Sequence, residues 1–173
     1  MNARRAIPLA FAALLAACVS GPPIEPSVVT PLKTSGVHTE IQLMPPEVSS
    51  RETDAKAVQL NADMGKLLTE ELQKQLGARG KTVGNGGRYS VIARLHAVYK
   101  ATRVKIGEQT KYDPGWIEVQ LVLQDRTRDE AAYSTLTKTR IPTTLMDQWF
   151  GPATEELARK TVQAAVVDFV SRL

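Results

Sequence analysis

The sequence has few of the residues that build catalytic and metal centres. Among its 173 residues there are one cysteine and two histidines. A single thiol excludes an internal disulfide, and neither His38 nor His96 has a second ligand at HxH, HxxE or HExxH spacing. No Gly-x-Ser-x-Gly element is present, and the consecutive acidic pairs at 70–71 and 155–156 would splay about 100° apart on a helix. We therefore expect no enzyme activity, no catalytic residue, no metal site and no cofactor.

Long hydrophobic runs are missing as well. The longest apolar stretch, residues 6–17, has twelve residues, whereas a helix that spans a bilayer needs about 20. The stretch follows Arg4 and Arg5, the positively charged start that is typical of a secretion signal. It ends in Leu15-Ala16-Ala17-Cys18, which resembles the lipobox of bacterial lipoproteins.

This resemblance implies an address and an attachment. In that family the cysteine thiol carries diacylglycerol through a thioether, the chain is cut before the cysteine, and the new amine is acylated. Residues 1–17 are then a lipoprotein signal peptide and Cys18 is the lipidation site. In the enterobacterial pattern an Asp after the cysteine retains the protein in the inner membrane. Val19 stands here, which implies the outer membrane with the domain facing the periplasm. The alternative is a buried N-terminal helix in which the cysteine is a small core residue.

The segment after Cys18 is rich in proline. Residues 18–36 hold four prolines among Ser, Thr and Gly, which predicts an extended tether with polyproline II character. At ~3.1 Å per residue it would hold the domain up to ~55 Å from the lipid. Loss of the signal peptide lowers Lys plus Arg from 22 to 20 against 18 acidic residues, a formal +2. So small an excess does not indicate a nucleic-acid partner.

Residues 37–173 are expected to form one α+β domain. Period-two alternation predicts strands over 37–43, 89–99, 117–123 and 133–139, the last nearer an edge of the sheet. A period of 3.6, which includes Val58, predicts a helix over 54–78, and Gly151-Pro152 opens a second helix that runs to the C-terminus. Residues 46–53 and 101–115 are expected to be polar connections. The fold class is therefore a two-layer β-α-β-β-β-α sandwich, with two helices on a four-stranded, mostly antiparallel sheet.

Four aromatic residues are the candidate partner-binding residues: Tyr112, Trp116, Trp149 and Phe150. Both tryptophans stand beside Gly or Pro, at predicted turns where recognition residues often lie. Trp149 and Phe150 have a structural alternative, in which they fasten the start of the last helix to the sheet.

One stretch of the chain is basic. It is either a solvated end of the sheet or a contact for lipid headgroups or anionic envelope polymers. The basic residues in and beside it are Arg94, Lys100, Arg103, Lys105 and Lys111.

A lipobox, a proline-rich tether and this element order together resemble small envelope lipoproteins of Gram-negative bacteria. The plan is similar to the curli-secretion-channel and penicillin-binding-protein-activator group, and to the auxiliary lipoproteins of lipid-transporting ABC systems. The resemblance implies a non-catalytic accessory component of an envelope assembly, secretion or transport machine, bound to another envelope protein or to a second copy of itself. The competing hypothesis is a carrier that holds a lipid or another hydrophobe between helix 54–78 and the sheet. An enzyme is the third.

Overall fold

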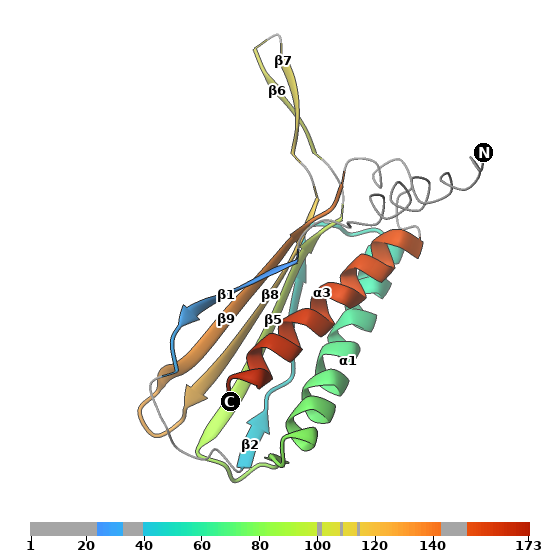
Figure 1. The fold of residues 1–173 in the computed structure, drawn as a ribbon. Helices are drawn as coiled ribbons and strands as arrows, with labels where there is room; N and C mark the ends of the chain where they lie inside the picture. The colour runs from blue at the N-terminus through green and yellow to red at the C-terminus, as the bar shows by residue number, and fades with distance from the viewer. Residues whose placement is uncertain (1–23, 33–39, 100–101, 108, 114, 143–151) are drawn as a thin grey trace, which may run out of the picture.

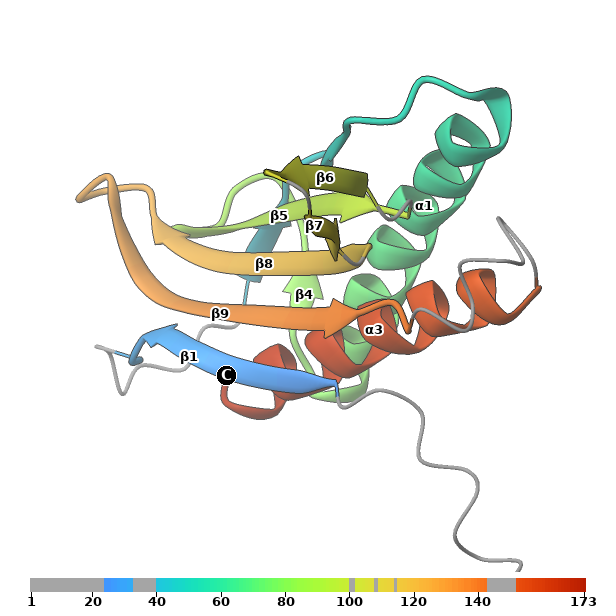
Figure 2. The same ribbon diagram turned by 90° about the horizontal axis from the view of Figure 1, so that it is seen from above.

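The computed structural model describes residues 24–32, 40–99, 102–107, 109–113, 115–142 and 152–173. The fold is a sheet with two helices on one of its faces (Figures 1 and 2). The sheet has seven strands in the order β1-β9-β8-β5-β2-β4, with β3 also paired to β5, so the predicted α+β class is confirmed and the predicted count of four strands is wrong. A separate two-stranded sheet is formed by β6 and β7. The elements are β1 Glu25–Thr30, β2 Glu40–Leu43, β3 Glu47–Ser50, α1 Ala55–Ala78, β4 Thr82–Val83, β5 Tyr89–Val98, β6 Thr102–Ile106, β7 Gln109–Asp113, β8 Trp116–Asp125, β9 Glu130–Arg140 and α3 Pro152–Ser171.

Three long antiparallel strands, β5, β8 and β9, make the centre of the sheet. Ala93 lies opposite Leu121, which lies opposite Thr135. Along each strand the residues alternate between the two faces of the sheet, and the odd-numbered positions from 117 to 125 are buried. This is the alternation that predicted these strands from the sequence.

The two helices cover the odd-numbered face. Asp54 caps α1, because its carboxylate accepts a hydrogen bond from the Ala57 amide at 3.0 Å. The apolar stripe of α1 is buried at Leu60, Met64, Leu68, Leu72 and Leu76 and partly buried at Leu67. Val58, predicted to belong to the stripe, is 54% exposed because it lies outside the face turned to the sheet. In α3, Phe169 is fully buried and stacks on Tyr133 of β9 with ring centroids 5.2 Å apart. No helix in the described part of the chain is long and apolar enough to span a bilayer.

The sheet begins inside the segment predicted to be the tether. Residues 25–30 form β1, which pairs antiparallel with β9, from Glu25 opposite Lys138 to Thr30 opposite Ser134. Four prolines made the segment resemble polyproline II, but the described part that contains Pro26 forms the edge of the sheet, where a missing amide is tolerated. β9 therefore lies one strand in from this edge.

Two predicted connections contain strands. The strand that Pro45-Pro46 interrupts resumes as β3, and both β2 and β3 pair in parallel with β5, so the stretch 46–53 is not a plain connection. Residues 102–113, predicted to be a polar loop, form the β6–β7 hairpin, whose turn includes Gly107 at φ +63°. The hairpin projects beyond the end of the main sheet (Figure 1).

Candidate binding groove

The sheet face opposite the helices carries an open depression. Both helices pack on the other face (Figure 2). Even-numbered side chains near the hairpin end of β5 and β8 are partly accessible here, namely Arg94, His96, Trp116, Glu118 and Gln120. The depression has a volume of about 560 Å³. We call it the sheet groove; its lining residues are Glu47, Val48, Ser49, Arg51, Arg94, Leu95, His96, Trp116, Glu118 and Gln120.

Trp116 is the largest side chain in the sheet groove, and neighbours on the two adjacent strands hold it. His96 of β5 stacks on the indole, with ring centroids 4.8 Å apart and planes 12° from parallel. Lys138 of β9 places its ammonium 4.9 Å from the indole centroid, within the range of a cation–π contact. The prediction placed Trp116 at an exposed turn, whereas it is the first residue of β8 and is half-buried.

Three charged groups of the sheet groove, Glu47, Arg94 and Glu118, take part in ion pairs. Arg94 donates to Glu47 at 2.8 Å, and Lys138 forms an ion pair with Glu118 at 3.0 Å. Side chains this exposed hold each other by only ~0–1 kcal/mol, so a partner can replace either contact. The sheet groove thus offers donors and acceptors of both signs around one indole ring.

His96 also contacts a hydroxyl group. Ser49 Oγ lies 2.7 Å from His96 Nδ1, a pairing that the sequence did not reveal because the two residues are 47 positions apart. A hydrolytic triad needs a carboxylate that orients the imidazole. Among the described residues, the carboxylate that the strand register places opposite His96 is that of Glu118. Glu118 forms an ion pair with Lys138. Nor do these residues contain a cluster of three metal-binding side chains.

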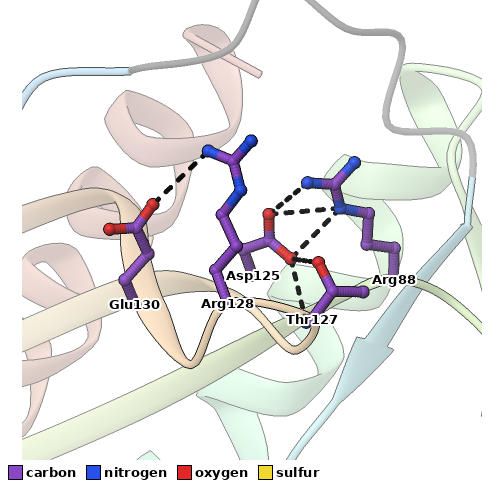
Figure 3. A network of polar contacts seen from close by, with 5 residues as sticks. All are labelled: Arg88, Asp125, Thr127, Arg128 and Glu130. Atoms are coloured by element: carbon purple, nitrogen blue, oxygen red, sulfur yellow. Dashed lines mark hydrogen bonds and ion pairs between the residues drawn. The ribbon is translucent and has the colours of Figure 1, made fainter.

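At the far end of β8 a second polar network ties the fold together (Figure 3). The Asp125 carboxylate accepts hydrogen bonds from Arg88 Nε at 3.1 Å, from the Thr127 amide at 3.0 Å and from the Thr127 hydroxyl at 2.7 Å. These donors, the Arg88 guanidinium first, hold the pKa of Asp125 well below its usual range. The network joins the start of β5 to the β8–β9 turn, where Arg128 also pairs with Glu130 at 3.7 Å. We interpret it as structural, since the buried Asp125 carboxylate bonds to groups of the fold itself.

The helix–sheet interface is filled. Met64 and Leu68 of α1 and Leu121 of β8 are 0% exposed, and the main hydrophobic cluster lies between the two layers. Two buried polar contacts cross it among the described residues. The Tyr99 hydroxyl donates to Asn61 Oδ1 at 2.8 Å, and the Thr161 hydroxyl of α3 donates to the Thr139 hydroxyl of β9 at 3.1 Å. Burial, followed by the charge of Glu52, raises the pKa of Tyr99 well above its usual value.

The structure describes two of the four candidate aromatics, and it places them in different sheets. Tyr112 belongs to β7, opposite Arg103, in a different sheet from Trp116. Trp149 and Phe150 lie outside the described residues, as do Cys18 and His38. The sequence did contain a signal for the sheet groove. In two predicted strands the even-numbered positions are polar, and this alternation places Arg94, His96, Glu118 and Gln120 on one face of the sheet.

No known protein-family model and no curated protein sequence matches the chain. Several solved structures are similar to it. The PelC dodecamer from Paraburkholderia phytofirmans is 10% identical, with 87% of this chain and 97% of that one covered and a TM-score of 0.45. A homolog of the neuraminyllactose-binding hemagglutinin from Helicobacter pylori is 13% identical, with 79% and 86% covered and a TM-score of 0.49. A minor lipoprotein from Acinetobacter baumannii is 15% identical, with 78% and 91% covered and a TM-score of 0.41.

Proposed function

We propose that this protein is an outer-membrane lipoprotein, tethered through Cys18, that serves as a non-catalytic accessory component of an envelope assembly, secretion or transport machine. The observation that carries the proposal is the sheet groove around Trp116, on the face of the sheet opposite the helices. Its partner is the surface of another envelope protein, because exposed ion pairs and a half-buried indole suit a mixed polar and apolar protein surface.

The filled helix–sheet interface supports an accessory role over a carrier. A carrier needs an apolar space for its ligand, and the core side chains between α1 and β8 already occupy that layer. The sheet groove is lined by Glu47, Arg94 and Glu118, so an acyl chain there would desolvate charged groups. Solvent extraction of the purified protein should release no stoichiometric lipid, and mass spectrometry should find acyl chains only as a covalent modification of the protein. A stoichiometric non-covalent lipid would instead favour the carrier.

Recovery of the partner with the full-length lipidated protein tests the sheet groove. Trp116→Ala removes the indole but no core residue, and it should lower recovery at least about tenfold, ~1.4 kcal/mol. Val167→Ala is the matched control, because Val167 is 49% exposed on α3, on the other face of the fold. Unchanged recovery with folded Trp116→Ala protein would contradict the proposal.

Two further variants separate binding from catalysis. Ser49→Ala removes the hydroxyl beside His96 and leaves the Trp116 ring in place, so we expect cellular function to survive. His96→Ala should reduce partner recovery by less than Trp116→Ala does, because it removes one support of the ring. If Ser49→Ala abolished function while the partner still bound, the Ser49–His96 pair would be a reaction centre.

The proposed outer-membrane address rests on Val19. Density-gradient separation of the two membranes should place the protein with outer-membrane markers, and recovery with inner-membrane markers would contradict the address. Val19→Asp is the paired variant, and in a host that follows the enterobacterial rule it should move the protein to the inner membrane.

A further inference from the structure

The described sheet starts close to the proposed anchor. β1 begins at Glu25, only seven positions after Cys18. Whatever path these residues take, seven peptide units span at most ~25 Å. This is less than half of the ~55 Å expected for a tether that reached residue 36. If Cys18 is lipidated, one particular end of the sheet must therefore lie near the bilayer.

The strand register identifies that end. Glu25 lies opposite Lys138 of β9, Lys138 lies opposite Glu118 of β8, and Glu118 lies opposite His96 of β5. Two residues past His96, β5 ends at Val98, and the chain then passes into the β6–β7 hairpin. The first residue of β1 and the base of the hairpin thus share one end of the sheet. The hairpin projects from that end, and the β8–β9 turn lies at the other (Figure 1).

The reach of the hairpin matches the short tether. Five residues per strand at ~3.4 Å each extend ~17 Å. A hairpin that projects this far from the anchored end meets the headgroup region before the rest of the domain does. The main sheet, with its ten-residue strand β8, separates the hairpin from the β8–β9 turn by ~34 Å.

The hairpin segment also has the composition of a headgroup contact. From Lys100 to Asp113, the last residue of β7, the chain holds four basic residues and two acidic ones. The register sets Arg103 opposite Tyr112, and Val104 opposite Lys111. Cations are attracted to anionic headgroups, and tyrosine is enriched at the membrane–water interface.

We propose that the β6–β7 hairpin lies on the membrane that holds the lipid anchor and binds the phosphate groups of anionic phospholipids. The inference rests on the proposed lipidation of Cys18, which brings this end of the sheet to the bilayer. It assigns the basic residues of the hairpin, Arg103, Lys105 and Lys111, a role that the sheet groove does not explain. It also makes Tyr112 a membrane residue and not part of the partner-binding surface.

A single-cysteine probe on the lipidated full-length protein tests the orientation, since the thiol of Cys18 is then already used. Gln109→Cys places a fluorophore in the hairpin and Arg128→Cys places the same fluorophore at the opposite end of the sheet. The protein is reconstituted in vesicles of phosphatidylethanolamine and phosphatidylglycerol that carry a headgroup spin label. The probe at 109 should be quenched several-fold more than the probe at 128. Equal quenching of the two probes would overturn the proposal.

Charge removal tests the ligand chemistry. Arg103→Gln combined with Lys105→Gln should lower the ratio of membrane-bound to free hairpin about thirtyfold, because each cation contributes ~1 kcal/mol at an anionic surface. Arg128→Gln combined with Arg172→Gln removes the same charge from the other end and should leave quenching at 109 unchanged. Vesicles of neutral phosphatidylcholine should reproduce the effect of the hairpin variant. An equal effect of both double variants would overturn the proposal.

Two competitors identify the source of the anion. Inorganic phosphate should reduce quenching no more than chloride does at matched ionic strength, and a larger reduction would make the hairpin a phosphate-ion site instead. Quenching that requires lipopolysaccharide or peptidoglycan in the sample would overturn the lipid assignment in favour of a polymer. Flotation of the vesicles reports the Cys18 anchor separately, so its failure is distinguishable from failure of the hairpin contact.

Discussion

Leu121 and Gln120 are neighbours on β8 whose side chains lie on opposite faces of the sheet. Leu121 is fully buried against the helix layer, between Ala93 of β5 and Thr135 of β9. Gln120 is partly accessible in the sheet groove, where Arg94 donates to its side-chain oxygen at 3.4 Å. Truncating each to alanine therefore compares the two faces at one point of one strand.

The two variants should differ several-fold in cost. Leu121→Ala removes three carbon atoms, which at ~0.8 kcal/mol each gives ~2.4 kcal/mol of lost transfer free energy. An unrelaxed cavity of ~70 Å³ adds ~1.7 kcal/mol, so the total is ~4 kcal/mol, within the ~2–5 kcal/mol found for such changes. Gln120→Ala loses one weak, partly exposed hydrogen bond and should cost less than ~1 kcal/mol.

Urea unfolding of the full-length protein in detergent, followed by circular dichroism, measures both losses. The slope of free energy against urea should stay the same in the two variants, so that midpoints can be compared directly. Equal losses would mean that the Gln120 face is as deeply covered as the Leu121 face. The two-layer architecture, and the sheet groove with it, would then be refuted.

Three further changes test the anchor, the ion network and the buried hydrogen bond. Cys18→Ala should leave an unacylated form that washes off membranes at high salt, where electrostatic attachment is screened, and retention in the membrane pellet would refute the anchor. The lowered pKa of Asp125 means that its stabilisation is complete above about pH 4, the unfolded value, and is lost as the pH falls toward the folded one. In thermal unfolding, Asp125→Asn should therefore melt below the parent at neutral pH, and the difference in melting temperature should narrow below about pH 4. A difference that stays constant with pH would contradict a lowered pKa of Asp125. Tyr99→Phe leaves buried Asn61 without its donor and should cost ~1–3 kcal/mol, and adding Asn61→Leu should recover part of the loss in urea unfolding.

The central strands and both helices were predictable because each carries its own pattern. Residues 89–98 and 116–125 alternate for ten positions, so one face of each had to be buried. The edge strands carry no such pattern. β1 has exposed Val28 and Val29 side by side, and β3 follows directly on Pro45-Pro46. β1 and β3 pair with the edges that β9 and β5 leave available. These edges come from distant parts of the chain, so the local sequence pattern does not predict the pairing.

The sheet groove was harder to foresee, because it is made where three strands meet. Trp116 was assigned to a turn on account of Gly115, but that glycine has a structural cause. A Cβ at 115 would lie 2.5 Å from the Val98 carbonyl oxygen, so only glycine lets β8 begin this close to the end of β5. The glycine therefore marks a close approach of two strands, and the residue after it enters the sheet.

If Cys18 carries the proposed lipid, the short distance from Cys18 to β1 also restricts which partners the sheet groove can reach. Trp116 begins the strand that directly follows the hairpin, and His96 precedes the hairpin by a few residues, so the sheet groove lies in the half of the sheet that contains the anchored end. With at most ~25 Å of chain between a lipidated Cys18 and Glu25, that half would stay next to the bilayer. A partner bound there must itself be embedded in the same membrane or lie on its surface, whereas a tether reaching residue 36 would have allowed contact deep in the periplasm. The sheet groove would then bind a partner protein at the same membrane on which the hairpin lies. Each of the two contacts would raise the effective concentration for the other.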